Sequence, residues 1–293
     1  MNRFLGMILI VLSAAAFGTL AIIGRYAYAA GMDVLTLLFL RFALSAVVMA
    51  FLLVARRERL PRGMTLVELL AMGAIGYVGQ AFSYFTAVKY ASAGLVALLL
   101  YLYPVFVMIL SAVFLGESIT RWKVAALGLA LAGLALMVGP AGGQWLGVIW
   151  ALVASVIYSL YIMVANRVVK EGSAIQSSTV ILAAAGVVSG LLMVSTGPHL
   201  PTTGAGWAAV AAIVLVATVI PIVTFLAGLQ RIGPTNAAML SVLEPLVTVL
   251  LAALLLGETL RLMTLLGGGL ILAAVLLLAR SELSTAARVP AGQ

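Results

Sequence analysis

The sequence of 293 residues contains no cysteine, a single histidine and few charged residues. Without cysteine the chain cannot form a disulfide, a thiolate nucleophile or a cysteine-ligated metal site. With His199 as the only histidine, a histidine-rich metal site and a Ser-His-Asp triad both lack parts. We therefore predict no catalytic site, no metal site and no cofactor. Charged residues make up 8% of the chain, against about 25% in soluble domains, which disfavours a soluble enzyme, a nucleic-acid-binding protein and a disordered chain.

What the sequence does contain is long apolar runs. Hydrophobic residues account for 65% of the chain, and the mean hydropathy is +1.27. A protein folded in water needs more polar surface than this composition supplies. Because a helix of about 20 apolar residues crosses the hydrocarbon core of a bilayer, we predict an all-α protein with ten transmembrane helices. The runs are residues 4–28, 33–55, 65–88, 92–115, 122–138, 144–166, 175–196, 205–229, 235–256 and 262–279.

Two alternative interpretations of the runs are weaker. Transmembrane β-strands are about 10 residues long and strictly alternating, whereas these runs are longer and uniformly apolar. The first run follows Arg3 and ends near Ala27-Tyr28-Ala29, which resembles a signal peptide. Its apolar part, however, exceeds the ~7–15 residues of a typical signal region, so we predict a membrane-spanning helix.

The basic residues predict how the helices are oriented. The net charge is +8, from 16 Lys and Arg against 8 Asp and Glu. Most Lys and Arg fall in loops that ten crossings would place on the same side as both termini, and such residues are enriched in cytoplasmic loops. We therefore expect cytoplasmic N- and C-termini, a polar and disordered cytoplasmic tail at 280–293, and a multi-pass location in a bacterial inner membrane.

The sequence also repeats itself weakly at an offset of 141 residues. The matching pairs include Pro104 with Pro245, Leu115-Gly116-Glu117 with Leu256-Gly257-Glu258, and Gly128 with Gly269. Residues 1–139 and 140–279 each contain five predicted helices, and five is odd, so the second copy enters the membrane from the opposite side. Two inverted five-helix repeats are the architecture of carriers that bind substrate between their halves near the membrane midplane.

Three prolines lie inside the runs, namely Pro104, Pro221 and Pro245. Each lacks an N–H and leaves the carbonyl four residues earlier without its helical partner. In lipid such a carbonyl must find another donor or face a wet cavity. The three carbonyls belong to Leu100, Ala217 and Ser241. We expect kinks at these prolines with a role in gating, the alternative being static kinks satisfied by neighbouring side chains.

Two charged residues, Glu244 and Arg41, lie deep inside runs. An ionised group at the bilayer centre costs about 2.5–3.5 kcal/mol on insertion scales, so both should point inward. Glu244 could bind a substrate amino group or carry a proton, and Arg41 could bind a substrate carboxylate. The alternative is a structural pair, or a hydrogen bond to the backbone of a broken helix.

Polar and aromatic residues recur at helical spacing in two other runs. Tyr77, Gln80 and Tyr84 share one helix face, as do Tyr158 and Tyr161. A tyrosine hydroxyl inside a membrane needs a hydrogen-bond partner, which lipid does not offer. These faces are therefore expected to line a substrate cavity or, alternatively, to pack between helices.

Two further tyrosines, Tyr101 and Tyr103, precede Pro104 and flank the kink expected in the fourth run. Residues two positions apart on a continuous helix point in different directions, and we include Tyr101 among the predicted substrate-binding residues. Position 103 corresponds to Glu244 in the second repeat, so the acidic residue is not duplicated.

These features resemble the drug/metabolite transporter superfamily, and in particular its ten-helix EamA-like metabolite exporters, which include bacterial aromatic amino acid exporters. The resemblance covers residues 1–279. It rests on the five-plus-five layout, on the Glu244-Pro245 pair, and on the equal spacing of Pro104 to Glu117 and Pro245 to Glu258. It implies export of small metabolites through a central cavity lined by helices of both halves.

The sequence therefore favours a secondary transporter that exports amino acids, by alternating access, as a monomer or weak homodimer. The chain has no Gly-x4-Gly-Lys-Ser/Thr motif, so ATP-driven transport by this chain alone is disfavoured. A single deep carboxylate favours uncoupled export over a multidrug or metabolite proton antiporter of the same fold. An intramembrane enzyme would need acid pairs, metal ligands or an activated nucleophile, and a channel is the remaining alternative.

Overall fold

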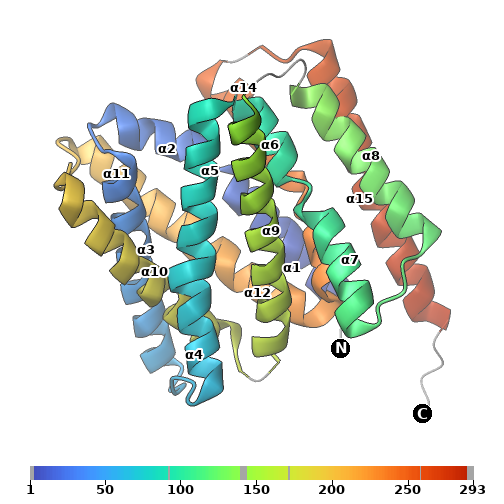
Figure 1. Cartoon of the computed structure of the whole chain (residues 1–293), viewed down its shortest axis with the longest axis horizontal. Coiled ribbons are helices and arrows are strands. Elements are labelled where there is room, and N and C mark those ends of the chain that lie inside the picture. Colours follow the sequence, from blue (N-terminus) through green and yellow to red (C-terminus); the bar gives the residue numbers. More distant parts are fainter. Residues whose placement is uncertain (1–2, 92, 139–143, 171, 258, 289–293) are drawn as a thin grey trace.

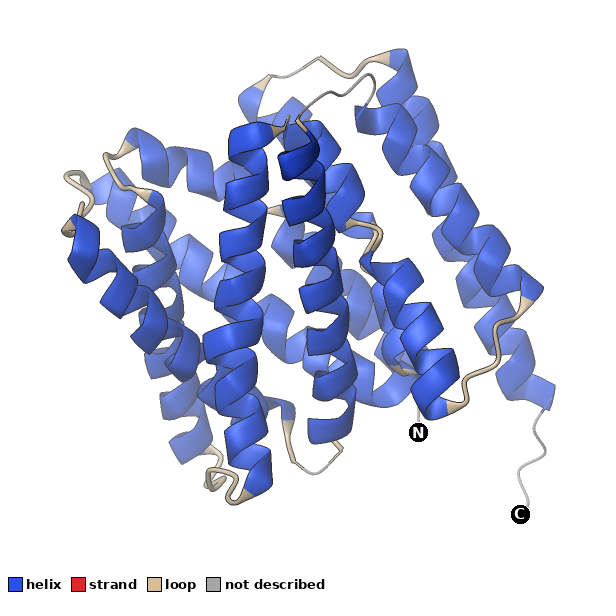
Figure 2. Ribbon diagram, in the orientation of Figure 1, coloured by secondary structure: helices blue, strands red, loops and turns tan. Residues whose placement is uncertain are grey.

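A computed structural model of the chain describes residues 3–91, 93–138, 144–170, 172–257 and 259–288. All regular elements in these ranges are helices, and no β-strand occurs among them (Figure 1; Figure 2). Ten helical stretches in the described chain are long and apolar enough to cross a membrane. The predicted number of membrane-spanning helices is thus confirmed, and we number these stretches as spans one to ten.

Five of the ten spans consist of more than one helix. With η marking a π-helix, the elements are α1 (Arg3–Gly18), α2 (Leu20–Ala29), α3 (Val34–Ala55), α4 (Met64–Ala71), η1 (Met72–Tyr77), α5 (Val78–Tyr90), α6 (Ala93–Leu100), α7 (Tyr103–Leu115), α8 (Arg121–Val138), α9 (Trp145–Val168), α10 (Ala174–Thr196), α11 (Gly204–Val214), η2 (Leu215–Val219), α12 (Ile220–Ile232), α13 (Pro234–Leu240), α14 (Leu243–Leu256) and α15 (Leu262–Arg288).

Interruptions occur at all three prolines singled out in the sequence. Span four breaks between α6 and α7 just before Pro104, and span nine breaks between α13 and α14 just before Pro245. In span eight, Pro221 follows η2 directly. The other π-helix, η1, lies at the corresponding place of span three, and π-helices inside α-helices are frequent at functional sites.

Two features differ from the sequence predictions. Span one, predicted as a continuous helix, is divided at Thr19 although it contains no proline. The glycine before this break, Gly18, lies so close to span nine that a Cβ added to it would be 2.9 Å from the carbonyl oxygen of Glu244. The tail after Arg280 was predicted to be disordered, but α15 continues through it to Arg288. No residue between Arg280 and Pro290 strongly opposes a helix. Residues 289–293 lie outside the described chain, as do Glu258 and the predicted boundary between the halves.

The helices pack across the two halves in a symmetric pattern. The four main pairs are α8 with α15, α3 with α10, α1 with α12, and α5 with α9. We number the spans one to five within each half. Span five of the first half then packs on span five of the second half, and span two packs on span two. Span one of each half packs on span three of the other half. The packing is therefore symmetric between the first five spans and the last five. The pair α8 and α15 forms the right-hand edge of the molecule in Figure 1.

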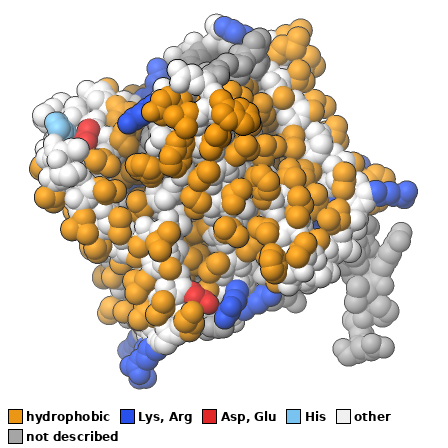
Figure 3. Space-filling model, viewed as in Figure 1, with side chains coloured by type: hydrophobic (Ala, Val, Ile, Leu, Met, Phe, Trp, Pro, Cys, Tyr) orange, Lys and Arg blue, Asp and Glu red, His pale blue; other side chains and the backbone are white. Residues whose placement is uncertain are grey.

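The outer surface is apolar over the middle of the molecule. Figure 3 shows hydrophobic side chains across this band, with Lys and Arg gathered toward its two ends. Large side chains such as Phe51, Phe114 and Trp145 are more than 70% exposed. A continuous apolar surface of this kind is a contact surface rather than a face for water. The chain is therefore a multi-pass membrane protein whose exposed band contacts lipid.

Candidate functional site

A small cavity of about 180 Å³ lies between the two halves. Its lining comes from spans one, two, three, four, six and nine. The lining residues are Phe17, Leu20, Arg41, Gly76, Tyr77, Gln80, Leu100, Tyr101, Tyr103, Tyr158, Tyr161 and Glu244. The volume is below the ~300–1,000 Å³ of pockets that hold drug-sized ligands, so the cavity in this conformation suits a small molecule.

Five tyrosines form one continuous aromatic wall of this cavity. The ring centres of Tyr77 and Tyr161 are 5.8 Å apart, those of Tyr161 and Tyr158 6.0 Å, and those of Tyr158 and Tyr103 4.6 Å. Tyr101 extends the wall, 6.0 Å from Tyr103. Two of these ring pairs, Tyr77 with Tyr161 and Tyr103 with Tyr158, meet edge to face, a favourable arrangement for aromatic rings. The wall offers both ring faces and hydroxyl groups to a ligand.

The break before Pro104 explains how Tyr101 and Tyr103 come to lie together. On a continuous helix they would point in different directions, but here α6 ends before Tyr101 and α7 begins at Tyr103. Both rings therefore reach the cavity, which corrects the sequence expectation. The hydroxyl of Tyr103 also donates a hydrogen bond to the carbonyl of Ala238, 3.3 Å away in α13. A residue of the first half thus stabilises the broken span of the second.

Glu244 enters the cavity from the first turn of α14. Its carboxylate faces the hydroxyl of Tyr101 and lies within electrostatic range of Arg41. Thr248, one turn further along, donates a hydrogen bond to the Gly18 carbonyl at 3.0 Å and lies 3.1 Å from the Glu244 carbonyl. The break in span one is therefore held directly against the helical turn that carries the acidic residue.

Arg41 reaches across from α3 to the π-helix of span eight. Its Nε donates to Thr218 Oγ1 at 2.9 Å, and its Nη2 lies 3.5 Å from the carbonyl oxygen of Ala217. That carbonyl is the one that Pro221 leaves without a helical partner. The Thr218 hydroxyl in turn donates to the Ile213 carbonyl at 2.8 Å. Part of the guanidinium thus binds the backbone of a broken helix, which was the alternative to substrate binding in the sequence analysis. Arg41 also lines the cavity.

The other two carbonyls released by prolines also have donors. The Ser155 hydroxyl donates to the Leu100 carbonyl at 3.0 Å, and the backbone N–H of Glu244 donates to the Ser241 carbonyl at 3.0 Å. The polar groups exposed by the kinks are therefore satisfied within the protein, as a stable structure in lipid requires.

Most of the predicted substrate-binding residues lie together in the cavity, but Tyr84 does not. It packs beside Ala87, Ala91 and Ala151, further along α5. Five of the lining residues were not predicted from the sequence. These are Phe17, Leu20, Gly76, Leu100 and Tyr103. The one available signal was the equivalence of Tyr103 with Glu244 at the repeat offset of 141 residues.

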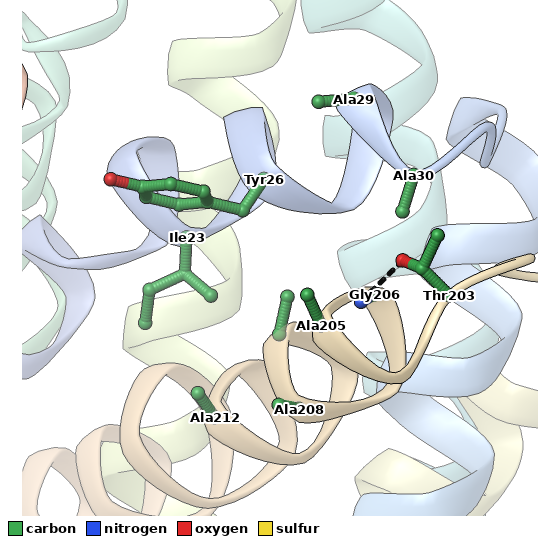
Figure 4. A pocket seen from close by; sticks show the side chains of 10 residues that line it. Ile23, Tyr26, Ala29, Ala30, Thr203, Ala205, Gly206, Ala208 and Ala212 are labelled. Atoms are coloured by element: carbon green, nitrogen blue, oxygen red, sulfur yellow. Dashed lines mark hydrogen bonds between the residues drawn. The ribbon is translucent and has the colours of Figure 1, made fainter.

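A second cavity, of about 410 Å³, lies between α2 and α11 (Figure 4). It is lined by Ile23, Tyr26 and a series of small residues, without an acidic or basic side chain. The hydroxyl of Thr203 at its edge already accepts a hydrogen bond from the Gly206 N–H, at 3.1 Å. We take the smaller central cavity as the candidate site because its lining includes two charged side chains of opposite sign, the buried Arg41 and the partly buried Glu244. No group of three or more His, Asp or Glu that could hold a metal occurs in the described ranges.

The fold and the central cavity define a class of protein: a multi-pass membrane protein with a polar site enclosed between its helices, as transporters have. Comparison with known proteins gives the family. The sequence profile of the EamA-like transporter family matches residues 4–139 and again residues 145–280. The chain belongs to this family, and it is a transporter rather than an enzyme.

Individual relatives agree with this assignment. An uncharacterized transporter of Archaeoglobus fulgidus is 32% identical over 274 residues, which is 92% of this chain and 94% of that protein. The aromatic amino acid exporter YddG of Ancylobacter novellus is 27% identical over 183 residues, 60% of this chain and 63% of that protein. A solved crystal structure superimposes with a TM-score of 0.84 at 23% identity, covering 98% of this chain and all of that one, which supports the fold.

Proposed function

We propose that this chain is a secondary transporter that exports small metabolites, amino acids in particular, by alternating access through the central cavity. The observation that carries the proposal is the position of Glu244, an acidic residue in a tyrosine-lined cavity beside two broken helices. A substrate ammonium group would interact with the Glu244 carboxylate, and an apolar or aromatic side chain would lie against the tyrosine wall. The resemblance to a protein named as an aromatic amino acid exporter supports this substrate class.

The proposal includes two inverted halves, residues 1–139 and 140–279, with cytoplasmic termini in a bacterial inner membrane. It is supported by the offset of 141 residues, by the twofold pattern of helix packing, and by the matching helix breaks in spans four and nine. Reporter fusions after residue 140 and after residue 293 test it. They should report opposite sides of the membrane, and the same side for both would exclude five crossings per half.

The energy source is the point on which two versions differ. We favour export down the substrate gradient without proton coupling, because Glu244 is the only carboxylate among the described residues that line the cavity. The second version is a multidrug or metabolite proton antiporter. It is favoured by the fact that Glu244 has no ion-pair partner among the described residues, so that its carboxylate is available to exchange a proton with a cationic substrate.

Counterflow in proteoliposomes tests the function. The full chain is reconstituted with internal L-phenylalanine, and uptake of labelled L-phenylalanine is followed with and without an imposed pH gradient. Saturable counterflow that Glu244→Gln abolishes is the expected result, and an unchanged rate in the gradient favours uncoupled transport. Glu68→Gln is the matched control. Glu68 forms an ion pair with Arg167, with 3.4 Å between their side-chain atoms, and it does not line the cavity. The proposal would be overturned if no amino acid supported counterflow, or if the protein showed a conductance that does not saturate with solute concentration.

A further inference from the structure

The cavity contains two charged side chains of opposite sign, Arg41 and Glu244, and neither has an ion-pair partner in the described part of the chain. Arg41 is only 7% exposed. Removing a charge from water is unfavourable unless an opposite charge or several hydrogen bonds replace the water. Other acidic residues are engaged elsewhere. Asp33 lies beside His199, Glu58 accepts from Ser173, Glu68 pairs with Arg167 and Glu117 pairs with Lys123.

The position of Arg41 leaves part of its guanidinium open to a ligand. The group has five N–H donors, of which one bonds Thr218 and a second approaches Ala217. The Tyr77 hydroxyl also faces it. Because Arg41 lines the cavity, the donors that neither span eight nor the Tyr77 hydroxyl uses are available there. The contacts to span eight also hold the guanidinium in one orientation, and a fixed guanidinium can bind both oxygens of a carboxylate in parallel.

The two charges and the wall between them match the chemistry of one class of molecule. Arg41 and Glu244 come from spans two and nine, and the rings of Tyr77, Tyr101 and Tyr103 lie along the same lining. A molecule carrying a carboxylate, an ammonium and a flat apolar side chain would supply a partner for each of these groups. A plain amine would leave the guanidinium without an anion, and a plain carboxylic acid would leave Glu244 without a cation.

We propose that Arg41, oriented by Thr218, is the carboxylate-binding residue of this cavity, so that the transporter selects zwitterions over amines and over carboxylic acids. This inference rests on the proposed function and adds to it the residue that determines specificity. A structural role of Arg41 alone makes a different prediction: its loss would weaken the binding of every ligand equally.

Equilibrium binding to the purified full chain in nanodiscs tests the inference with three probes. L-Phenylalanine carries both charges, phenethylamine lacks the carboxylate, and 3-phenylpropionate lacks the ammonium. For the wild type we expect L-phenylalanine to bind at least about tenfold more tightly than either analogue, because a site built for a polar group discriminates strongly against its absence. For Arg41→Gln we expect L-phenylalanine and phenethylamine to bind within about threefold of one another, while the Kd of phenethylamine changes by less than about threefold.

Two further variants keep the test decisive. Thr218→Val keeps the shape of the side chain but removes the acceptor that orients Arg41, and it should reduce the preference for L-phenylalanine without abolishing it. Lys89→Gln removes a basic residue that does not line the cavity and should change nothing. Equal binding of L-phenylalanine and phenethylamine by the wild type, or an equal loss for both probes in Arg41→Gln, would overturn the inference while leaving amino acid transport intact. Absence of binding and of counterflow for every amino acid would instead overturn the proposed function.

Discussion

The hydroxyl of Ser155 in α9 lies 3.0 Å from the carbonyl oxygen of Leu100, the last residue of α6, and donates a hydrogen bond to it. This is the carbonyl that Pro104 deprives of its helical partner. Ser155 is fully buried, so a side chain of the second half completes a helix end of the first half inside the protein. The predicted kink in span four is thus stabilised by a contact between the halves.

Replacement of Ser155 should measure this contact. We expect Ser155→Ala to lower the free energy of unfolding by about 1–3 kcal/mol, because the Leu100 carbonyl would be left buried and unpaired. Unfolding of the detergent-solubilised protein by denaturant gives the value. Ser159→Ala is the control, since Ser159 is equally buried in α9 but donates to the nearby Val156 carbonyl in its own helix. Equal losses in the two variants would contradict the interpretation.

Pro245 tests whether the break in span nine acts in gating. Pro245→Ala restores an N–H that can pair with the Ser241 carbonyl and continue the helix through the break. We expect transport of L-phenylalanine to slow by about tenfold while its equilibrium Kd changes by less than about threefold, as expected for a conformational step. Pro234→Ala is the comparison, since Pro234 opens α13, where an N–H has no helical partner. A wild-type transport rate in Pro245→Ala would favour the static kink.

Spans five and ten cross at two glycines, and this contact should be sensitive to size. A Cβ on Gly267 would overlap the carbonyl oxygen of Gly133, while a Cβ on Gly269 would have no neighbour within 4 Å. We therefore expect Gly267→Ala to lower the melting temperature, because α15 must move away from α8. Gly269→Ala should stabilise the protein by up to about 1 kcal/mol through helix propensity. Thermal unfolding in detergent distinguishes the two, and the same sign for both would refute the packing argument.

Asp33, at the start of α3, gives stability a pH dependence outside the membrane. It accepts a hydrogen bond from the Thr36 N–H at 3.0 Å and lies 3.8 Å from His199 Nδ1. Burial alone would raise the pKa of Asp33, but the hydrogen bonds from Thr36 and the neighbouring His199 lower it below its ordinary value of 3.8. The carboxylate therefore stabilises the fold at neutral pH, and this contribution is lost as the pH falls through the lowered pKa.

Comparison of wild type with Asp33→Asn isolates this charge, since asparagine keeps an oxygen that can cap the helix. We expect the variant to be less stable by about 0.5–1 kcal/mol near pH 7, a small value because the site is partly exposed. The difference should shrink as the pH falls through the lowered pKa of the wild-type carboxylate, because the protonated group no longer carries the charge that asparagine lacks. Thermal melts over this range provide the measurement. A difference that grows toward acid would mean that the fold raises the pKa of Asp33 instead of lowering it.

Much of the fold could be predicted from the sequence because its determinants are local. The length of an apolar run fixes a span, and a proline such as Pro245 removes a hydrogen bond wherever it stands. The break at Thr19 could not be predicted in this way, because it accompanies the contact between Gly18 and the distant Glu244 carbonyl. The lining of the candidate site was predicted only in part, because helix periodicity gives the face on which a residue lies but not its contacts with distant segments. Tyr84 shares a helix face with Tyr77 by periodicity, but seven residues further along it lies about 10 Å away along the helix axis.

The close approach at Gly18 carries a consequence for how selectivity can change in this molecule. Any larger residue there would press on the main chain from which the acidic side chain extends, and would displace that charge without touching a solute. The range of transported compounds can therefore be altered from a position that does not line the cavity. Searches for variants with new substrates should therefore include positions of the first span in addition to the residues that line the cavity.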